Sequence, residues 1–124
     1  MAEATQVIGA KIIAVVDSLS KAIATSLEKA KLKFNVNKYE CHHIVAKKDR
    51  RAALSRLILD GVDLDVENSE NKIYVKYNLH KHLHTTAYHF GVFELLVFAK
   101  NNRKKVIMVL NTIKNLLYNE NKVC

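Results

Sequence analysis

The sequence contains no proline and no tryptophan, and only three of its 124 residues are glycine. Proline and glycine are the residues that most often break helices and form tight turns, so their scarcity favours long helices. The two cysteines, Cys41 and Cys124, are too few for a disulfide scaffold and are compatible with a reducing compartment. We expect Cys124, the last residue, to fray at the end of the chain rather than to pair.

Acidic residues are also in deficit, because 12 Asp and Glu face 20 Lys and Arg, which gives a net charge of +8. Such an excess predicts a polyanionic or acidic partner: nucleic acid, an anionic membrane surface or an acidic protein. A hydrophobic content of 49% is sufficient for a core, and the length predicts one domain, 1–124. Lys11 and Asp17 interrupt the apolar start of the chain, so we expect no signal peptide and no stable membrane insertion.

Periodicity predicts a mainly helical α+β fold with two short strands. An amphipathic helix is predicted over 5–32, with an apolar stripe at Ile8, Ile12, Val15, Val16, Leu19, Ile23 and Leu27. We expect this stripe to pack on a core rather than on a membrane surface. The remaining elements are a strand at 34–45, a short helix at 47–61 with Ala53, Leu54, Leu57 and Ile58 inward, a strand at 72–77, a helix at 79–100 capped by Asn78, and a helix at 103–118.

All six histidines lie in two places, a doublet at 42–43 and a group at 80–89. On a continuous helix, residues four apart project about 40° from each other, so His80 and His84 form a pair able to bind one divalent metal. His82 and His89 lie outside that pair. Neighbouring side chains at a strand end diverge, so one histidine of the doublet can join the metal while the other stays free as a general base. The pattern predicts a hydrolytic metal site.

The segments CHHIV, GVDLDVENSENKIYV and HKHLHTTAYHFGVFELL resemble the HNH (ββα-metal) nuclease superfamily. Within it they resemble the AHH-type nuclease domains of bacterial polymorphic and contact-dependent inhibition toxins. The resemblance covers about residues 38–100. It implies a ββα-metal core within 34–100, packed with an N-terminal helical segment (1–33), an inserted helix and a C-terminal helix (101–124).

The resemblance also implies a role for each matching residue. His42, His80 and His84 would bind the metal, and His43 would be the general base that activates water. Asn71 would orient that base or brace its loop.

Three positions leave alternatives open. Asn68 is a rival for the role of Asn71, because both lie in the same short loop. Cys41 stands where the family usually has alanine, either as a small-residue exchange or as a fourth metal ligand. His82 would replace His80 or His84 if the helix had a different register.

The implied activity is a metal-dependent endonuclease (DNase) that leaves a 5′-phosphate and a 3′-hydroxyl. Neutral imidazoles favour bound Zn²⁺ or Ni²⁺, with Mg²⁺ or Mn²⁺ as alternatives for turnover. We expect contacts to DNA phosphates, with little sequence specificity, from Lys47, Lys48, Arg51, Lys72, Lys76 and Lys81. As a module secreted or delivered within a larger toxin, it would act in the cytoplasm of the target cell, and an acidic immunity protein would protect the producer.

Other functions fit the same residues. An RNase, such as a tRNase, would use the same fold. A non-catalytic nucleic-acid-binding domain would hold a structural metal, with Cys41 as a ligand. An interaction module would dock a partner or a membrane through residues 1–30.

Overall fold

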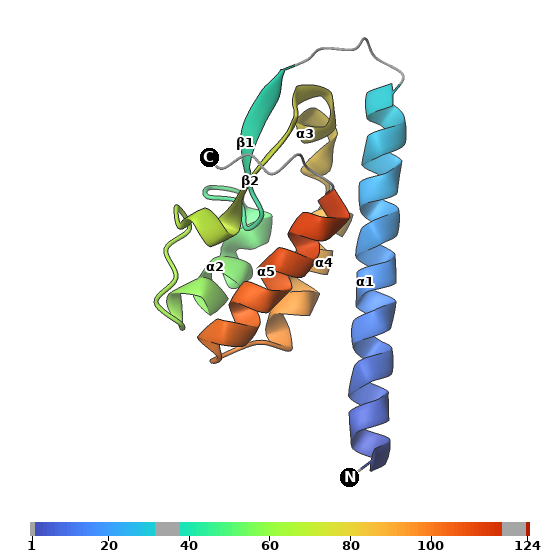
Figure 1. Cartoon of the computed structure of the whole chain (residues 1–124), viewed down its shortest axis with the longest axis vertical. Coiled ribbons are helices and arrows are strands. Elements are labelled where there is room, and N and C mark those ends of the chain that lie inside the picture. Colours follow the sequence, from blue (N-terminus) through green and yellow to red (C-terminus); the bar gives the residue numbers. More distant parts are fainter. Residues whose placement is uncertain (1, 32–37, 118–123) are drawn as a thin grey trace.

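The structure is a computed structural model that describes the backbone of residues 2–31, 38–117 and 124, and the side chains of these residues except 2–9 and 31. Within these ranges it contains five α-helices, two short 3-10 helices and one two-stranded antiparallel sheet, so the prediction of a mainly helical α+β fold is confirmed. The elements are α1 (Ala2–Lys31), β1 (Tyr39–His43), η1 (Arg50–Ala52), α2 (Ala53–Asp60), η2 (Ser69–Asn71), β2 (Lys72–Lys76), α3 (Tyr77–Leu83), α4 (Thr86–Val97) and α5 (Arg103–Leu117) (Figure 1).

The sheet places the histidine doublet beside the start of α3. Strands β1 and β2 pair so that His42 faces Ile73 and His43 faces Lys72. Strand β2 continues without a loop into α3, which packs against both strands. The predicted first strand was longer, but 34–37 lie outside the described residues. The sheet and α3 together hold the two histidine groups on neighbouring elements.

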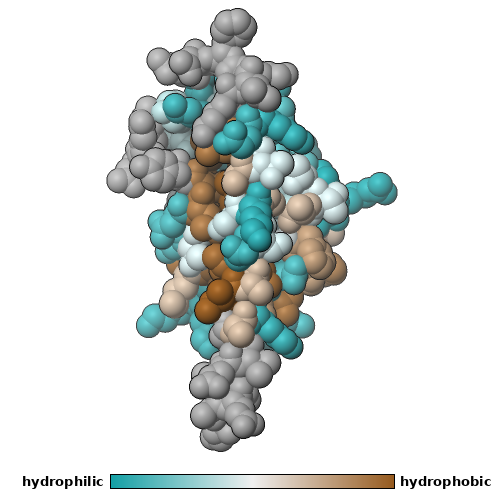
Figure 2. Space-filling view, turned by 90° about the vertical axis from the view of Figure 1, so that its right-hand side faces the viewer, coloured by the Kyte–Doolittle hydropathy of each residue, from teal (hydrophilic) through white to brown (hydrophobic). Residues whose placement is uncertain are grey.

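Helix α1 lies alongside α3 and α4 and extends well beyond them at its N-terminal end (Figure 1). Its buried side includes Leu19 and Ile23, so the predicted apolar stripe packs on the core there. Leu27, also predicted to pack, is 41% exposed. The side chain of Ile8 lies outside the described residues. The face of the molecule on this side mixes hydrophilic and hydrophobic surface (Figure 2).

Two contacts fix α1 against the other helices. A Cβ at Gly91 would lie 3.0 Å from Leu19 Cδ1, so glycine at this position allows α1 and α4 to approach closely. The hydroxyl of Ser26 donates a hydrogen bond of 2.7 Å to the carbonyl oxygen of His82, which joins α1 to α3. Among the described helices, none is both long and apolar enough to cross a membrane.

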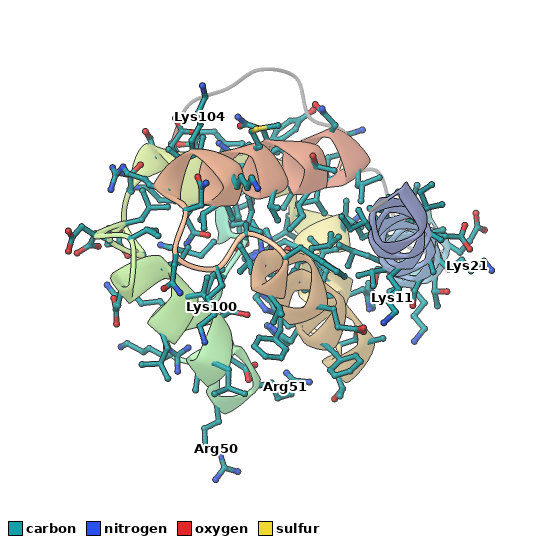
Figure 3. The ribbon with its side chains drawn as sticks, turned by 90° about the horizontal axis from the view of Figure 1, so that it is seen from below. Lys11, Lys21, Arg50, Arg51, Lys100 and Lys104 are labelled. Atoms are coloured by element: carbon teal, nitrogen blue, oxygen red, sulfur yellow. A yellow bond between two sulfur atoms is a disulfide. The ribbon has the colours of Figure 1, made fainter. Side chains whose placement is uncertain are left out.

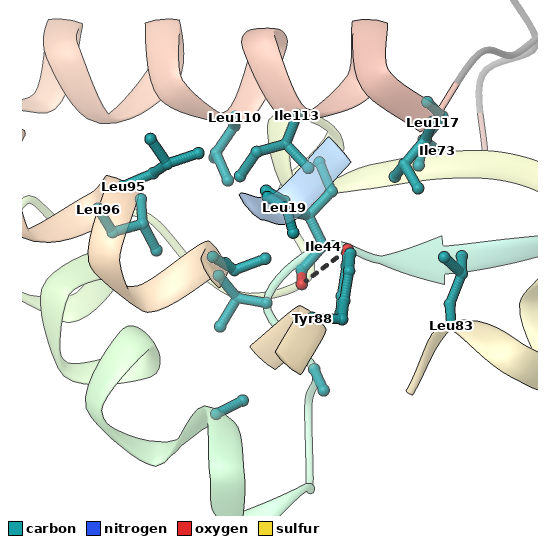
Figure 4. Close-up of a cluster of buried hydrophobic side chains, with 14 of the residues drawn as sticks. Leu19, Ile44, Ile73, Leu83, Tyr88, Leu95, Leu96, Leu110, Ile113 and Leu117 are labelled. Carbon is teal, nitrogen blue, oxygen red and sulfur yellow. Dashed lines mark hydrogen bonds between the residues drawn. The ribbon is translucent and has the colours of Figure 1, made fainter. Parts of the chain in front are cut away.

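The core lies between α1, α4, α5 and the sheet. Its most deeply buried apolar side chains include Leu19, Leu96, Leu110, Ile113 and Leu117 (Figure 4). The buried residues of α5 recur at the spacing of one helical face. Tyr88 lies in the same core, where its hydroxyl reaches the carbonyl oxygen of Ile44.

The single helix predicted at 79–100 is wrong, because the structure divides it into α3 and α4. The Thr85 hydroxyl accepts a hydrogen bond from the backbone N–H of Tyr88 and caps α4. In a continuous helix, the N–H of Tyr88 would bond to a carbonyl oxygen of the preceding turn. Here the Thr85 hydroxyl accepts that hydrogen bond instead. Asn78 is also not the cap of α3, which begins at Tyr77 directly after the extended residue Lys76.

Helix α2 is rotated relative to the prediction. Ile58 is buried as predicted, but Ala53, Leu54 and Leu57 are exposed, the two leucines by 57% and 62%. The side of α2 that is buried carries Ser55, Ile58 and Leu59. Helix α2 packs against α4, and the face that it buries includes a serine.

Cys41 and Cys124 form a disulfide, which corrects the expectation that Cys124 frays unpaired. Their Cα atoms lie 5.8 Å apart, although 83 positions separate them in the sequence. The spacing of two isolated cysteines carries no signal for such a long-range pairing. The bond ties the end of the chain to β1, next to His42.

Candidate metal centre

Three imidazoles from separate parts of the chain meet beside the sheet. His42 comes from β1, His80 from α3 and His84 from the residue after α3, and one ring nitrogen of each lies within 4.8 Å of the others. The ring centroids are 5.1 Å apart for His42 and His80, and 5.3 Å apart for His42 and His84. The Nε2 atoms of His80 and His84 approach to 3.3 Å. Three imidazole donors facing one space are a ligand set that suits a divalent transition metal.

The pairing of His80 with His84 does not arise from a continuous helix. His84 lies just beyond α3, with φ −75° and ψ 65°, which is not a helical conformation. Its ring nevertheless turns toward His80. The spacing argument thus named the neighbouring pair, but the geometry it assumed is wrong.

His42 has a free nitrogen in a position where a ligand fits. The residue is fully buried, and its Nε2 lies 2.7 Å from the hydroxyl oxygen of Tyr88. That hydroxyl donates to the carbonyl oxygen of Ile44 at 3.4 Å (Figure 4), so we assign the Tyr88 oxygen as acceptor and His42 Nε2–H as donor. Within the described residues, Nδ1 is buried and has no hydrogen-bond partner. A lone pair left in this way is costly unless something binds it, and a metal ion would do so.

Burial keeps these imidazoles in the form that binds metal. Desolvation, followed by the charges of His80 and His84, holds the pKa of His42 well below its ordinary value. Desolvation also lowers the pKa of His84. Both rings are therefore neutral near pH 7, as a metal ligand must be.

Replacing Tyr88 by phenylalanine tests the assigned orientation of His42. Removing the hydroxyl leaves His42 Nε2–H without its acceptor, so we expect zinc affinity to fall about 10–100-fold. Isothermal titration calorimetry measures it, and Tyr77→Phe, which alters a partly exposed ring near Lys38 and Lys81, is the control. Equal zinc affinity in Tyr88→Phe and wild type would contradict the assignment.

His80 is oriented by Glu40, a residue that the sequence did not single out. His80 Nδ1 lies 3.1 Å from Glu40 Oε2, so Nδ1–H donates to the carboxylate and leaves the Nε2 lone pair free. A carboxylate behind a metal-binding histidine fixes its tautomer and raises its basicity. Strand alternation was the available signal, because Glu40 and His42, two residues apart, project from the same side of β1.

A second group of possible ligands contains Asp49, His84 and His89, again within 4.8 Å. His89 is 2% exposed, and burial lowers its pKa to about 4. Its Nε2 lies 3.4 Å from Asp49 Oδ2, while Arg51 donates to the same carboxylate at 2.7 Å. This hydrogen bond holds the pKa of Asp49 well below its usual range. Arg51 already neutralises the Asp49 carboxylate, which makes this second group less suited to a cation than the three histidines.

Asn71 joins the segment after the doublet to the loop before β2. The residue is fully buried; its Oδ1 accepts from Val45 N at 2.8 Å, and its Nδ2 donates to Val45 O at 3.1 Å and to Val66 O at 2.9 Å. Asn68 has a different function, since its side chain accepts from Glu70 N and caps η2. The bracing contacts are therefore made by Asn71, and the turn contact by Asn68.

His43 is held by Glu67, which was also not singled out from the sequence. His43 Nε2 lies 2.9 Å from Glu67 Oε1. The other two candidates from the sequence do not join the three histidines. Cys41 is in the disulfide, and His82 belongs to neither possible ligand group in the described part of the chain.

The basic residues predicted to contact phosphates lie in different environments. Lys47 and Lys72 both face Glu67, at 3.3 and 3.8 Å. Arg51 lies between the start of η1 and α4, where it also donates to the His84 carbonyl oxygen, whereas Arg50 points away from the body (Figure 3). Lys81 lies over an aromatic ring, and Lys48 and Lys76 are exposed. The six lysines and arginines that Figure 3 labels lie on different sides of the molecule.

Two antiparallel strands lead directly into a helix, and histidines of the first strand and of the helix region meet in one space. This arrangement defines the core of the HNH class of nucleases. Residues 23–119 match the AHH family, a nuclease family of the HNH/ENDO VII superfamily with conserved AHH. The match spans most of the chain, which belongs to this family. Within the matched residues, the one pair of adjacent histidines is His42 and His43, which follows a cysteine rather than an alanine. No curated protein and no solved structure matches the chain significantly.

Proposed function

We propose that this nuclease is a metal-dependent endonuclease that hydrolyses phosphodiester bonds of DNA. The observation that carries the proposal is the convergence of His42, His80 and His84, with a buried His42 Nδ1 that no described residue satisfies. His43, the next residue along β1, supplies an imidazole outside this ligand set. The site thus has both a place for an ion and a separate proton acceptor.

In the proposed reaction, His42, His80 and His84 would hold a divalent ion, which would supply positive charge to stabilise the phosphate as it reacts. His43 accepts a proton from a water molecule as the water oxygen attacks phosphorus. The bond from phosphorus to the 3′-oxygen breaks, and the leaving oxygen takes a proton from solvent. The products carry a 5′-phosphate and a 3′-hydroxyl.

The resident ion we propose is Zn²⁺ or Ni²⁺, because all three donors are neutral imidazoles. Mg²⁺ and Mn²⁺ prefer oxygen ligands, so they are expected to support turnover only at higher concentrations. Glu40 and Tyr88 keep His80 and His42 oriented for the ion.

We propose that the basic residues near the site contact the DNA backbone rather than base edges. Lys48, Lys76 and Lys81 are exposed. We identify no helix or β-ribbon among the described elements that would contact base edges in a groove. Cleavage should therefore show little sequence preference and should weaken steeply as salt rises.

We further propose that the nuclease is delivered as part of a larger bacterial toxin and acts in the cytoplasm of the target cell. A producing cell would then need an inhibitor, and the net charge of +8 favours an acidic immunity protein that covers the basic surface. Co-purification with an acidic protein encoded beside the nuclease gene would support this role.

Removal of the metal tests the proposed activity. Supercoiled plasmid incubated with the purified protein should be nicked and linearised, EDTA should abolish cleavage, and zinc or nickel should restore it above the level reached with magnesium or manganese. Agarose gel electrophoresis measures the products. If the metal-loaded protein leaves the plasmid intact, the proposal of a DNase fails.

A parallel digestion of transfer RNA and total RNA separates DNase from RNase activity on the same fold. If RNA is cleaved faster than plasmid at equal protein concentration, RNA rather than DNA is the substrate. Binding of plasmid without cleavage, together with unfolding on metal removal, would indicate a nucleic-acid-binding domain with a structural metal.

A further inference from the structure

We propose that Glu67 positions His43, so that the two residues act as a carboxylate–imidazole dyad in the reaction. This inference rests on the proposed hydrolytic function. Among the described residues, the one hydrogen bond of the His43 side chain runs from Nε2 to Glu67 Oε1, at 2.9 Å. The side chains are 24% and 46% exposed, so the pair lies at the surface, where solvent and substrate can reach it.

The contact determines which nitrogen of His43 can act as the base. A carboxylate only accepts hydrogen bonds, so Nε2 must carry the proton that it donates to Glu67. The lone pair of the neutral ring is then on Nδ1. When Nδ1 takes a proton from water, the imidazolium that forms remains paired with the Glu67 carboxylate through Nε2–H. The carboxylate stabilises the charged ring, and the proton on Nδ1 later passes to solvent.

The loop that carries Glu67 is itself fixed in place. Asp65 Oδ1 accepts a hydrogen bond from Glu67 N at 2.7 Å, and Asn71 Nδ2 donates to the carbonyl oxygen of the adjacent Val66. Asn71 also makes two hydrogen bonds to Val45, two residues after His43. A single buried side chain therefore sets the position of Glu67 relative to His43.

Two lysines hold the same carboxylate. Lys47 Nζ lies 3.3 Å from Glu67 Oε1, and Lys72 Nζ lies 3.8 Å from Oε2. Lys72 is also the residue that pairs with His43 across the sheet. The hydrogen bond from His43, followed by that from Lys47, lowers the pKa of Glu67, so it stays ionised near neutral pH. Both lysines were predicted to bind phosphates, but in this structure they face Glu67.

These contacts predict that removing the Glu67 carboxylate lowers kcat without raising KM. In Glu67→Ala, His43 loses the group that orients its ring, so kcat for plasmid cleavage should fall about 10–100-fold. Lys47 and Lys72 become free to bind phosphates, so KM should fall or stay the same. A smaller fraction of folded enzyme would also lower the apparent kcat without changing KM, so circular dichroism must first show that Glu67→Ala is folded like wild type.

Glu67→Gln and Glu70→Ala complete the activity test. The amide of Glu67→Gln still offers an oxygen to Nε2–H without the negative charge, so its kcat should lie between those of Glu67→Ala and wild type. Glu70 lies in the same loop but pairs with Lys114, so Glu70→Ala should keep the wild-type kcat. Wild-type kcat in Glu67→Ala would overturn the proposal, as would an equal loss in Glu70→Ala.

A spectroscopic measurement tests whether His43 donates a hydrogen bond to Glu67, and it does not depend on activity. In low-temperature ¹H–¹⁵N spectra of histidine-labelled protein, the Nε2-bound proton of His43 should be protected enough from exchange to be seen. His43→Ala identifies its signal. The signal should persist in Glu70→Ala and disappear in Glu67→Ala, and a signal indifferent to Glu67 would overturn the dyad. If wild type cleaves no nucleic acid, the proposed function fails, while this spectrum still decides the contact.

Discussion

Replacing His43 by alanine is expected to lower the rate of plasmid cleavage by about 10²–10⁴, the usual contribution of a positioned general base. His43 lies outside the group of three histidines that meet, so the variant should still bind zinc with nearly wild-type affinity. The expected result is thus a protein that is folded and metal-loaded but nearly inactive. Cleavage rates with saturating metal, together with zinc titration calorimetry, measure both properties.

The control for this variant is His82→Ala, which removes an imidazole that belongs to neither possible ligand group in the described ranges. Its side chain lies on α3, so its folding should be checked by circular dichroism. We expect it to retain most of the activity. If His43→Ala cleaves plasmid at the wild-type rate, His43 is not the base.

Removing a metal ligand should have the second large effect. His84→Ala is expected to weaken zinc binding by more than about 100-fold, because changes to residues that only support a ligand already cost 10–100-fold. His84 is partly accessible to solvent and follows α3, so its loss disturbs the core less than that of the fully buried His42. Activity should fall with metal occupancy and should recover in part at high zinc concentrations.

The matched control is His89→Ala, since His89 packs against His84 with ring centroids 5.4 Å apart and belongs to the second group, with Asp49. If the ion is held by His42, His80 and His84, this change should weaken zinc binding much less than His84→Ala. A larger loss in His89→Ala would move the ion to the group with Asp49.

The parts of the fold that follow from periodicity could be predicted from the sequence. The apolar spacing of α1 and α5 identified both helices, since one face of each is buried. The division between α3 and α4 was missed because it depends on a single hydroxyl, that of Thr85, which caps α4. The rotation of α2 was missed because both of its faces carry apolar residues, so periodicity alone does not select the buried one.

The residues of the candidate site also divide into those that the sequence identified and those that only the structure revealed. The spacing of the histidines and the resemblance to a known motif were enough to name His42, His80 and His84, which the structure brings together. The hydrogen-bond partners of the histidines could not be assigned from the sequence, because Glu40, Glu67 and Tyr88 lie 40, 24 and 46 positions from the histidines that they contact. Contacts over such separations depend on the tertiary fold, as does the disulfide of Cys41 with Cys124.

Anomalous scattering from crystals grown with zinc tests the central claim most directly, because it locates the ion without reference to any activity. The account predicts one strong peak at the zinc edge between the rings of His42, His80 and His84. A peak on Asp49 and His89 alone, or the three rings turned away from each other with no ion between them, would contradict it.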